Sequence, residues 1–196
     1  MKKLLTALVI IVSMGMAGSV CAADFAKGWS AYKAGDYATA LREWTPLAEQ
    51  GNAFAQYNLG MMYATVDALN DHKKAVKWLK LSSEQGNARA QVILGNLYDR
   101  GRGVAQNHKT AVKWYRLAAE QGYIAAQASL GVMYGTGQGV RQDNLYAHMW
   151  GNIAASSGNV GGRRLLDLVV NQMTPDQIVL AQQIAQRCVR KKFKGC

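Results

Sequence analysis

The sequence predicts an all-α protein built from stacked pairs of helices, and three observations support this fold class. The chain has 196 residues but only 2 prolines, which suits a mostly helical protein. Its residues repeat with a period of 35 or 36, a length typical of helical repeat proteins. Each period divides into two helical stretches joined by a turn. Because a single pair of helices cannot bury its apolar face alone, neighbouring pairs are expected to stack into a solenoid.

Composition narrows the class of protein further. Apolar residues make up 49% of the chain and charged residues 18%, which excludes a disordered chain. The 20 glycines follow no Gly-X-Y period, which excludes collagen. The 23 Lys and Arg residues exceed the 12 acidic residues, so the formal net charge is +11. Such an excess is compatible with binding to nucleic acid or an anionic membrane surface, or with solubility alone.

The N-terminus has the layout of a secretory signal peptide. Lys2 and Lys3 precede an apolar stretch over residues 4–16, and small residues follow up to Ala23. We expect cleavage after Ala23, which makes the mature protein periplasmic or secreted and argues against a nucleic-acid partner. An uncleaved anchor helix is the alternative, and lipidation at Cys21 is disfavoured because no lipobox precedes it. No later segment has the apolar run of a membrane helix, so no transmembrane segment is expected after cleavage.

Several residue types repeat together and define four units over residues 24–158. A glycine marks the end of each unit, another glycine lies in the first helix, and a tryptophan recurs in the second helix. The unit boundaries are expected at about residues 24–52, 53–87, 88–122 and 123–158. These landmarks are Gly51, Gly86, Gly122 and Gly158, then Gly60, Gly95 and Gly131, and then Trp78, Trp114 and Trp150.

Each unit is expected to contain two helices with recognisable ends. In the second unit, the first helix is predicted at about residues 53–64 and the second at about residues 73–85. An Asp or Asn precedes each second helix and can accept hydrogen bonds from the free N–H groups of its first turn. The glycine that ends each unit suits the left-handed residue that follows a helix. The predicted N-cap residues are Asp36, Asp71, Asn107 and Asp143.

The residue pattern of these units resembles that of the Sel1-like repeat family, which is related to the tetratricopeptide repeats. The third unit matches best, with Ala-x-Ala-Gln-x-x-Leu-Gly-x-x-Tyr from Ala88, a Gly-x-Gly-Val turn from Gly101 and Ala-x-x-Trp-Tyr from Ala111. The first unit has Gly35 but no Gly-x-Gly turn, and is more similar to a plain tetratricopeptide repeat. The resemblance implies a right-handed solenoid of antiparallel helix pairs that is used for protein–protein interaction.

Residues 159–196 depart from the period and are predicted to form a helical C-terminal cap with a basic tail. A short helix is expected over Arg163–Met173. Thr174 and Gln177 then form a capping box that starts a second helix, with Pro175 at its first position. One face of that helix is expected to carry Ile178, Ala181, Ile184, Ala185 and Cys188.

Two cysteines, Cys188 and Cys196, remain after the expected cleavage. An even number of cysteines in an oxidising compartment indicates a disulfide, so we predict that this pair is bridged. Two free thiols are the alternative.

No set of residues in the sequence predicts catalysis, a metal site or a cofactor. Ser30 and Lys33 match the Ser-x-x-Lys motif of penicillin-recognising enzymes, but the other motifs of that site are absent. A hydrolase acting on β-lactams or the cell wall is therefore a minor alternative to a non-enzymatic protein. His72, His108 and His148 have no second ligand at metal spacing, and His72 and His108, which share one repeat position, are expected to be surface residues at helix starts.

Partner binding is expected in a groove formed by the first helix of each unit. By analogy with tetratricopeptide repeats, the outward positions of these helices face the partner. Aromatic, Met and Arg side chains there suit a peptide or helix partner, although Tyr57 and Met61 could instead only pack between units. The predicted groove residues are Phe54, Tyr57 and Met61 in the second unit, Arg89, Val92, Asn96, Asp99 and Arg100 in the third, and Ala128 and Val132 in the fourth.

Basic residues gather in the C-terminal cap, where they could dock an anionic lipid surface, an envelope polymer or an acidic protein. The alternative is a solvated helix face that complements the helix dipole. The sequence as a whole predicts an exported repeat protein that binds another protein of the envelope, the secreted fraction or a host. Binding of an anionic envelope polymer through the cap is the second hypothesis. The basic-cap residues are Arg163, Arg164, Arg187, Arg190, Lys191, Lys192 and Lys194.

Overall fold

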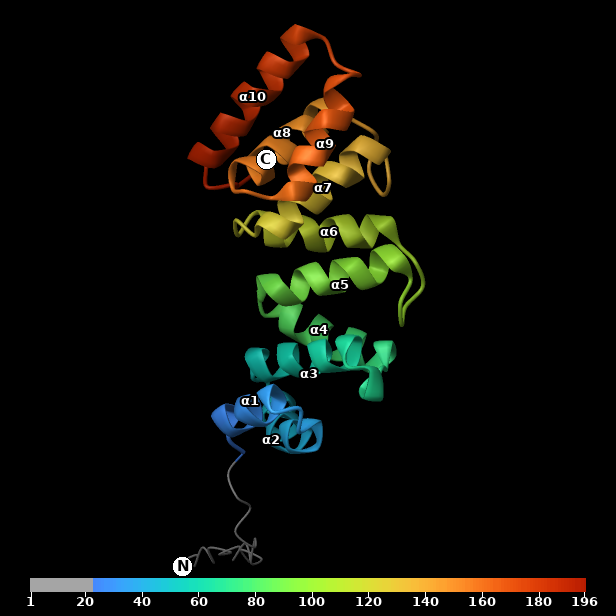
Figure 1. Cartoon of the computed structure of the whole chain (residues 1–196), viewed down its shortest axis with the longest axis vertical. Helices are drawn as coiled ribbons and strands as arrows, with labels where there is room; N and C mark the ends of the chain where they lie inside the picture. Colours follow the sequence, from blue (N-terminus) through green and yellow to red (C-terminus); the bar gives the residue numbers. More distant parts are fainter. Residues whose placement is uncertain (1–22) are drawn as a thin grey trace, which may run out of the picture.

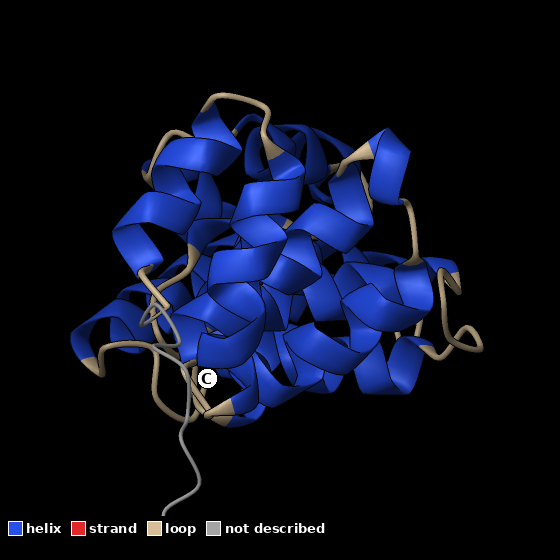
Figure 2. Ribbon diagram, turned by 90° about the horizontal axis from the view of Figure 1, so that it is seen from below, coloured by secondary structure: helices blue, strands red, loops and turns tan. Residues whose placement is uncertain are grey.

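The computed structural model describes residues 23–196, and over this range every regular element is helical (Figures 1 and 2). All of the predicted signal peptide except Ala23 lies outside the described residues. The helices are α1 (Phe25–Lys33), α2 (Tyr37–Glu49), α3 (Ala53–Thr65), α4 (His72–Glu84), α5 (Ala88–Arg100), α6 (His108–Ala119), α7 (Ile124–Thr136), α8 (Asn144–Ser156), α9 (Val160–Val170) and α10 (Pro175–Arg190), with a 3-10 turn at Asp67–Leu69.

The helices from α1 to α9 pack in sequence order, each on the next. Figure 1 shows the resulting stack, with α1 and α2 at one end of the long axis and α8, α9 and α10 at the other. Packing between sequence neighbours is the defining property of a solenoid. The predicted all-α solenoid of helix pairs is therefore confirmed.

The predicted helix ends are also confirmed. The side chains of Asp36, Asp71, Asn107 and Asp143 accept hydrogen bonds from backbone N–H groups in the first turns of α2, α4, α6 and α8. These bonds satisfy donors that a helix N-terminus otherwise leaves unpaired. The glycines that end the units have φ values from +82° to +92°, a conformation that other residues rarely adopt. The four landmark glycines are Gly51, Gly86, Gly122 and Gly158.

The two helices of each pair approach closely at a glycine in the first helix. A Cβ on Gly60 would lie 2.5 Å from Leu79 Cγ, and one on Gly95 would lie 2.6 Å from Tyr115 Cε1. Gly28 makes the corresponding approach to Trp44 in the first pair. Each glycine therefore provides the space in which a large side chain of the partner helix is buried.

The fourth pair uses a different residue for this contact. In the repeat register, the large residues Trp44, Leu79 and Tyr115 are followed by Gly151. The space beside Gly131 is filled instead by Leu165 of α9, whose Cδ2 would lie 2.5 Å from a Cβ on Gly131. Helix α9 thus supplies the side chain that α8 lacks, which fixes the cap to the last repeat.

Helix α9 begins at Val160, three residues before the start predicted from the sequence, and ends at Val170 rather than at Met173. Asn159 caps the helix by accepting a hydrogen bond from Gly162 N at 2.9 Å. A Cβ on Gly162 would lie 2.8 Å from the backbone of α8, so the glycines allow close packing here. We predicted that Gly161 and Gly162 would precede the helix, which was wrong because the contact of Gly162 with α8 and the cap by Asn159 stabilise the first turn.

Helix α10 folds back onto α8 and is closed by a disulfide. Its capping box is present, and Ala181, Ala185 and Cys188 are buried as predicted. The predicted disulfide between Cys188 and Cys196 is confirmed, with a Cα–Cα distance of 5.6 Å. Within the bridged turn, Phe193 packs against the core and lies beside Gly122. The bridge therefore holds the C-terminal turn against the α6–α7 connection.

Opening the disulfide is expected to lower the free energy of unfolding by about 2–3 kcal/mol, because a short covalent loop restricts the unfolded chain. Thermal unfolding of the oxidised protein, with and without reductant, measures this difference. A variant with both Cys188→Ser and Cys196→Ser should match the reduced protein and be insensitive to reductant. Equal stability of the oxidised and reduced protein would contradict a structural role for the bridge.

Candidate functional site

A cavity with a volume of about 810 Å³ lies beside α3. Helices α1, α3 and α5 contribute to its walls, and the residue before α7 closes one side. Cavities of this size are typical of ligand and peptide sites. We call it the aromatic groove and define it by Phe25, Trp29, Phe54, Tyr57, Met61, Arg89 and Tyr123.

Helix α3 supplies the central wall of the aromatic groove. Asn52 starts the helix by accepting hydrogen bonds from Phe54 N and Ala55 N at 3.0 and 2.9 Å. From this start, Phe54, Tyr57 and Met61 lie three and four residues apart, which puts them on one face. The Tyr57 hydroxyl contacts Met61 Sδ at 3.6 Å. The start of the helix therefore determines which side chains enter the groove.

Helix α1 supplies two further aromatic walls, which the buried Trp44 holds in place. Trp44 Nε1 donates a hydrogen bond to the Phe25 carbonyl at 3.2 Å. Its ring lies 5.9 Å from the Phe25 ring and 6.4 Å from the Trp29 ring, between centroids. The N-terminal end of α1 is held separately by the buried Glu43, which contacts Lys27 at 2.9 Å and accepts from Asp24 N at 3.2 Å. Lys27 and Asp24 N both lower the pKa of this carboxyl group, so it stays ionised.

Arg89 is the one charged residue among those that line the groove in the described chain. It forms no ion pair with a carboxylate of residues 23–196. Burial raises the pKa of the neighbouring Tyr57 hydroxyl, and the Arg89 guanidinium opposes this effect. The groove therefore combines a mostly apolar lining with one unpaired positive charge.

The structure brings together four of the predicted groove residues, namely Phe54, Tyr57, Met61 and Arg89. Val92 does not join them, because it is only 9% exposed and lies in the core cluster against which Tyr123 packs. Asn96 is half-buried and accepts a hydrogen bond from the Tyr115 hydroxyl at 2.7 Å. Asp99, Arg100, Ala128 and Val132 do not line the cavity either.

Three lining aromatics, Phe25, Trp29 and Tyr123, were not among the predicted residues. The first unit has a shorter turn, so its Gly28 precedes Gly60 by 32 residues rather than 35. Aligning these two glycines places Phe25 and Trp29 at the positions of Tyr57 and Met61, a signal that the sequence does contain. Tyr123 occupies the N-cap position that Asp24 holds in the first unit, Asn52 and Asn87 hold in the second and third, and Asn159 holds before α9.

The three histidines occupy two kinds of environment. His72 and His108 are the first residues of α4 and α6, and His108 Nδ1 lies 2.7 Å from Asp99 Oδ1. His148 lies inside α8 and is only 3% exposed. It differs from the other two because it is the fifth residue of its helix, on an inward face, rather than the first.

Burial lowers the pKa of His148, whose Nδ1 has no hydrogen-bond partner in the described chain. At pH values above 6.5, the ordinary pKa of a histidine, His148 is neutral in both the folded and the unfolded chain and has no effect on stability. Below 6.5 the unfolded chain binds a proton that the folded chain does not, so stability should fall as pH drops toward the folded-state pKa.

We therefore expect the melting temperature to fall by a few degrees between pH 7.5 and 5.5. The same scan on His148→Gln isolates this effect, since His72 and His108 remain. An equal decrease in the variant would contradict the assignment to His148.

The structure gives no support for catalysis by the Ser-x-x-Lys match at Ser30 and Lys33. Ser30 is exposed on α1, and its hydroxyl forms no hydrogen bond with another described residue. Within residues 23–196, no group of three His, Cys, Asp or Glu side chains could hold a metal ion. No described helix is both long and apolar enough to cross a membrane.

The seven basic-cap residues are all exposed and belong to α9, α10 and the turn after α10. None of them forms an ion pair with a described acidic residue. Arg190 also lines a second cavity, between α8 and α10.

Comparison with known proteins identifies the repeat. The family model for the Sel1 repeat matches residues 53–87, 88–123 and 124–159, which is more than half of the chain. No curated protein matches. Sel1 repeats are generally protein–protein interaction modules and typically non-enzymatic.

Solved structures agree with this match. A protective antigen present in uropathogenic Escherichia coli strains, which displays an SLR fold, is 34% identical with a TM-score of 0.74. That alignment covers 79% of this chain but 34% of the antigen, so this chain spans about a third of its length. A Sel1 repeat protein from Oxalobacter formigenes is 35% identical over 65% of this chain and 97% of its own, with a TM-score of 0.58. Helicobacter pylori cysteine-rich protein B shares the fold, at 18% identity over 67% of this chain and 95% of its own, with a TM-score of 0.53. Because the helix pairs, their landmark glycines and these matches agree, the chain belongs to the Sel1 repeat family.

Proposed function

We propose that this protein is an exported, non-enzymatic adaptor whose aromatic groove binds a segment of another protein. The partner belongs to the envelope, the secreted fraction or a host. Export is supported by the signal-peptide layout of residues 1–23 and by the disulfide, which is typical of oxidising compartments. The lining of the groove suits a segment with apolar side chains and a carboxylate that can pair with Arg89.

The observation that carries this proposal is the position of Tyr123. Asn52 and Asn87 cap the first helices of the second and third units and Asn159 caps α9, whereas Tyr123 makes no side-chain cap to α7. Losing such a cap costs about 0.5–2 kcal/mol of helix stability. The tyrosine instead places its ring in the wall of the groove. A residue that lowers the stability of its own helix but lines a cavity is a feature of binding sites.

Site-specific photocrosslinking tests this proposal. A photoreactive amino acid in place of Phe54, which is 68% exposed in the groove, is expected to capture a partner in cells. The same amino acid in place of Leu168, which is 67% exposed on α9, is the matched control. Capture of the same species from both positions with equal yield would contradict a groove-specific partner.

Charge reversal provides the second arm of the test. Arg89→Glu is expected to weaken capture at least about tenfold, because it replaces the unpaired cation with a repelling charge. Arg102→Glu makes the same change in an exposed turn away from the groove and should leave capture unchanged. Tyr123→Asn should weaken capture while α7 stays folded, since asparagine restores the helix cap.

A second candidate function is the binding of an anionic envelope polymer or membrane surface by the basic cap. The seven exposed, unpaired cations favour this candidate. Binding of this kind should fall steeply with salt concentration, because exposed charges are screened. Cosedimentation with anionic vesicles or cell-wall sacculi at two salt concentrations measures it, and salt-insensitive binding would argue against it.

A further inference from the structure

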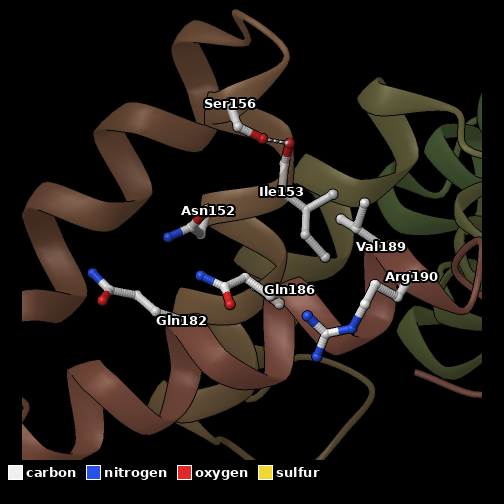
Figure 3. Close-up of a pocket in the computed structure, with 8 residues that line it drawn as sticks. Asn152, Ile153, Ser156, Gln182, Gln186, Val189 and Arg190 are labelled. Atoms are coloured by element: carbon white, nitrogen blue, oxygen red, sulfur yellow. Dashed lines mark hydrogen bonds between the residues drawn. The ribbon is translucent and has the colours of Figure 1, made fainter.

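A second cavity lies between α8 and α10, at the opposite end of the stack from α1 (Figures 1 and 3). Its volume is about 490 Å³. Its apolar lining comes from Ile153 of α8 and from Ala185 and Val189 of α10. Asn152 and Ser156 of α8 and Gln182, Gln186 and Arg190 of α10 line its sides.

The polar side chains of this cavity are available to a ligand. The carboxamides of Asn152, Gln182 and Gln186 and the guanidinium of Arg190 form no hydrogen bond with another described residue. Ser156 Oγ donates to the Ile153 carbonyl at 2.8 Å and keeps its lone pairs free to accept. In Figure 3, the Asn152 amide lies opposite the amides from α10, and the Arg190 guanidinium extends back toward Gln186.

The spacing of these groups matches an extended peptide. Gln182, Gln186 and Arg190 are four residues apart on one face of α10, so successive groups are separated by about 6 Å along the helix. Alternate residues of an extended strand are separated by about 6.5 Å, and their backbone groups point to the same side. Because each carboxamide offers both a donor and an acceptor, it can bond one peptide N–H and one peptide C=O.

The charged residues around the cavity indicate that its ligand carries a negative charge. No acidic residue lines it, and Arg190 is its charged member. Arg187 and Lys191 lie on the same end of α10, so the local potential is positive. A guanidinium is suited to bind a carboxylate through two parallel hydrogen bonds.

We propose that this cavity is a second peptide-binding site, separate from the aromatic groove, for an extended segment that ends in or carries a carboxylate. Gln182 and Gln186 bind alternate backbone amides, Asn152 binds the peptide from the opposite side, and Arg190 binds the carboxylate. Apolar side chains of the peptide rest on Ile153 and Val189. This site does not depend on the groove, and each can fail without the other.

The test is a titration of the ¹⁵N-labelled protein, followed by NMR, with the acetylated peptide Thr-Val-Thr-Val-Glu. Saturable shifts are expected for the side-chain amides of Asn152, Gln182 and Gln186 and for Arg190 Nε–H. The neutral peptide Thr-Val-Thr-Val-Gln amide should bind about tenfold more weakly, because the carboxylate contact is lost. Equal binding of the neutral peptide, or no shift of these signals, would overturn the proposal.

Matched variants distinguish specific binding by Arg190 from non-specific attraction to the positive charge of this region. Arg190→Gln should weaken binding about tenfold, whereas Arg187→Gln removes the same charge outside the cavity and should have little effect. Equal weakening by both variants would show diffuse charge attraction and reject the site. An acidic disaccharide that shifts these signals when the peptide does not would likewise reject a peptide ligand. Arg89→Gln, in the aromatic groove, should bind this peptide as the unmodified protein does.

Discussion

Trp44→Ala is expected to destabilise the N-terminal helix pair by about 3–5 kcal/mol, the loss typical of removing a large buried aromatic side chain. Trp44 is fully buried and contacts the rings of Phe25, Trp29 and Tyr32. It also donates the hydrogen bond that positions Phe25. Because repeat proteins are stabilised by contacts between neighbours, the loss should concentrate in α1 and α2.

Hydrogen exchange measures this expected effect by region. Protection should be lost over residues 25–49, while α5 to α10 retain it. Leu117→Ala is the matched control, since Leu117 is 45% exposed on α6 and should contribute less than about 0.5 kcal/mol. A uniform loss of protection along the whole chain would contradict the expectation that each repeat is stabilised mainly by contacts with its neighbours. The same variant should also weaken partner capture, since two walls of the groove depend on Trp44.

Gly95→Ala is expected to lower the free energy of unfolding by about 1–3 kcal/mol, as overpacking of a core does. The direction of this effect is diagnostic, because alanine in a helix interior is normally favoured over glycine by about 1 kcal/mol. At this position the new methyl group would lie 2.6 Å from the buried ring of Tyr115. The ring cannot move freely, because its hydroxyl donates to Asn96 Oδ1 at 2.7 Å.

Thermal unfolding compares Gly95→Ala with Gly135→Ala, a helical glycine of α7 in looser surroundings. The nearest atom to a Cβ on Gly135 is Leu165 Cδ1 at 3.3 Å, the end of a flexible side chain. The control should therefore change stability little. For a chain of this size, each kcal/mol shifts the melting temperature by about 2–4 °C. A stabilising effect of Gly95→Ala would contradict the close approach of α5 and α6.

Local features of the fold could be read from the sequence because each has a local physical cause. The N-cap residues Asp36 and Asp71 and the capping box at Thr174 act within one helical turn, so their residue types are informative by themselves. The start of α9 was harder to predict. Gly161 and Gly162 weaken a helix in isolation, and the close contact of Gly162 with α8 explains why the helix starts before them.

The candidate site could be predicted only where a single helix determines it. Phe54, Tyr57 and Met61 share one face of α3, and their spacing alone places them together. Val92 occupies the equivalent position to Tyr57 but is buried, because exposure there depends on a neighbouring unit. The contribution of Tyr123 depends on a departure from the asparagine pattern, which is recognised as meaningful once its ring is seen in the groove.

Gly151 stands where the other units have a large side chain, and Leu165 of α9 fills the space that it leaves. The position at which a repeat is added therefore decides whether the cap can still pack. An additional copy of residues 88–122 inserted after Gly122 would pack its first helix on α6 and its second on α7, so it would be flanked by repeats on both sides. An additional copy inserted after Gly158 would displace Leu165 and leave Gly131 facing a void. Gene duplication can therefore lengthen this protein from within, whereas growth at the cap requires a new residue at position 151.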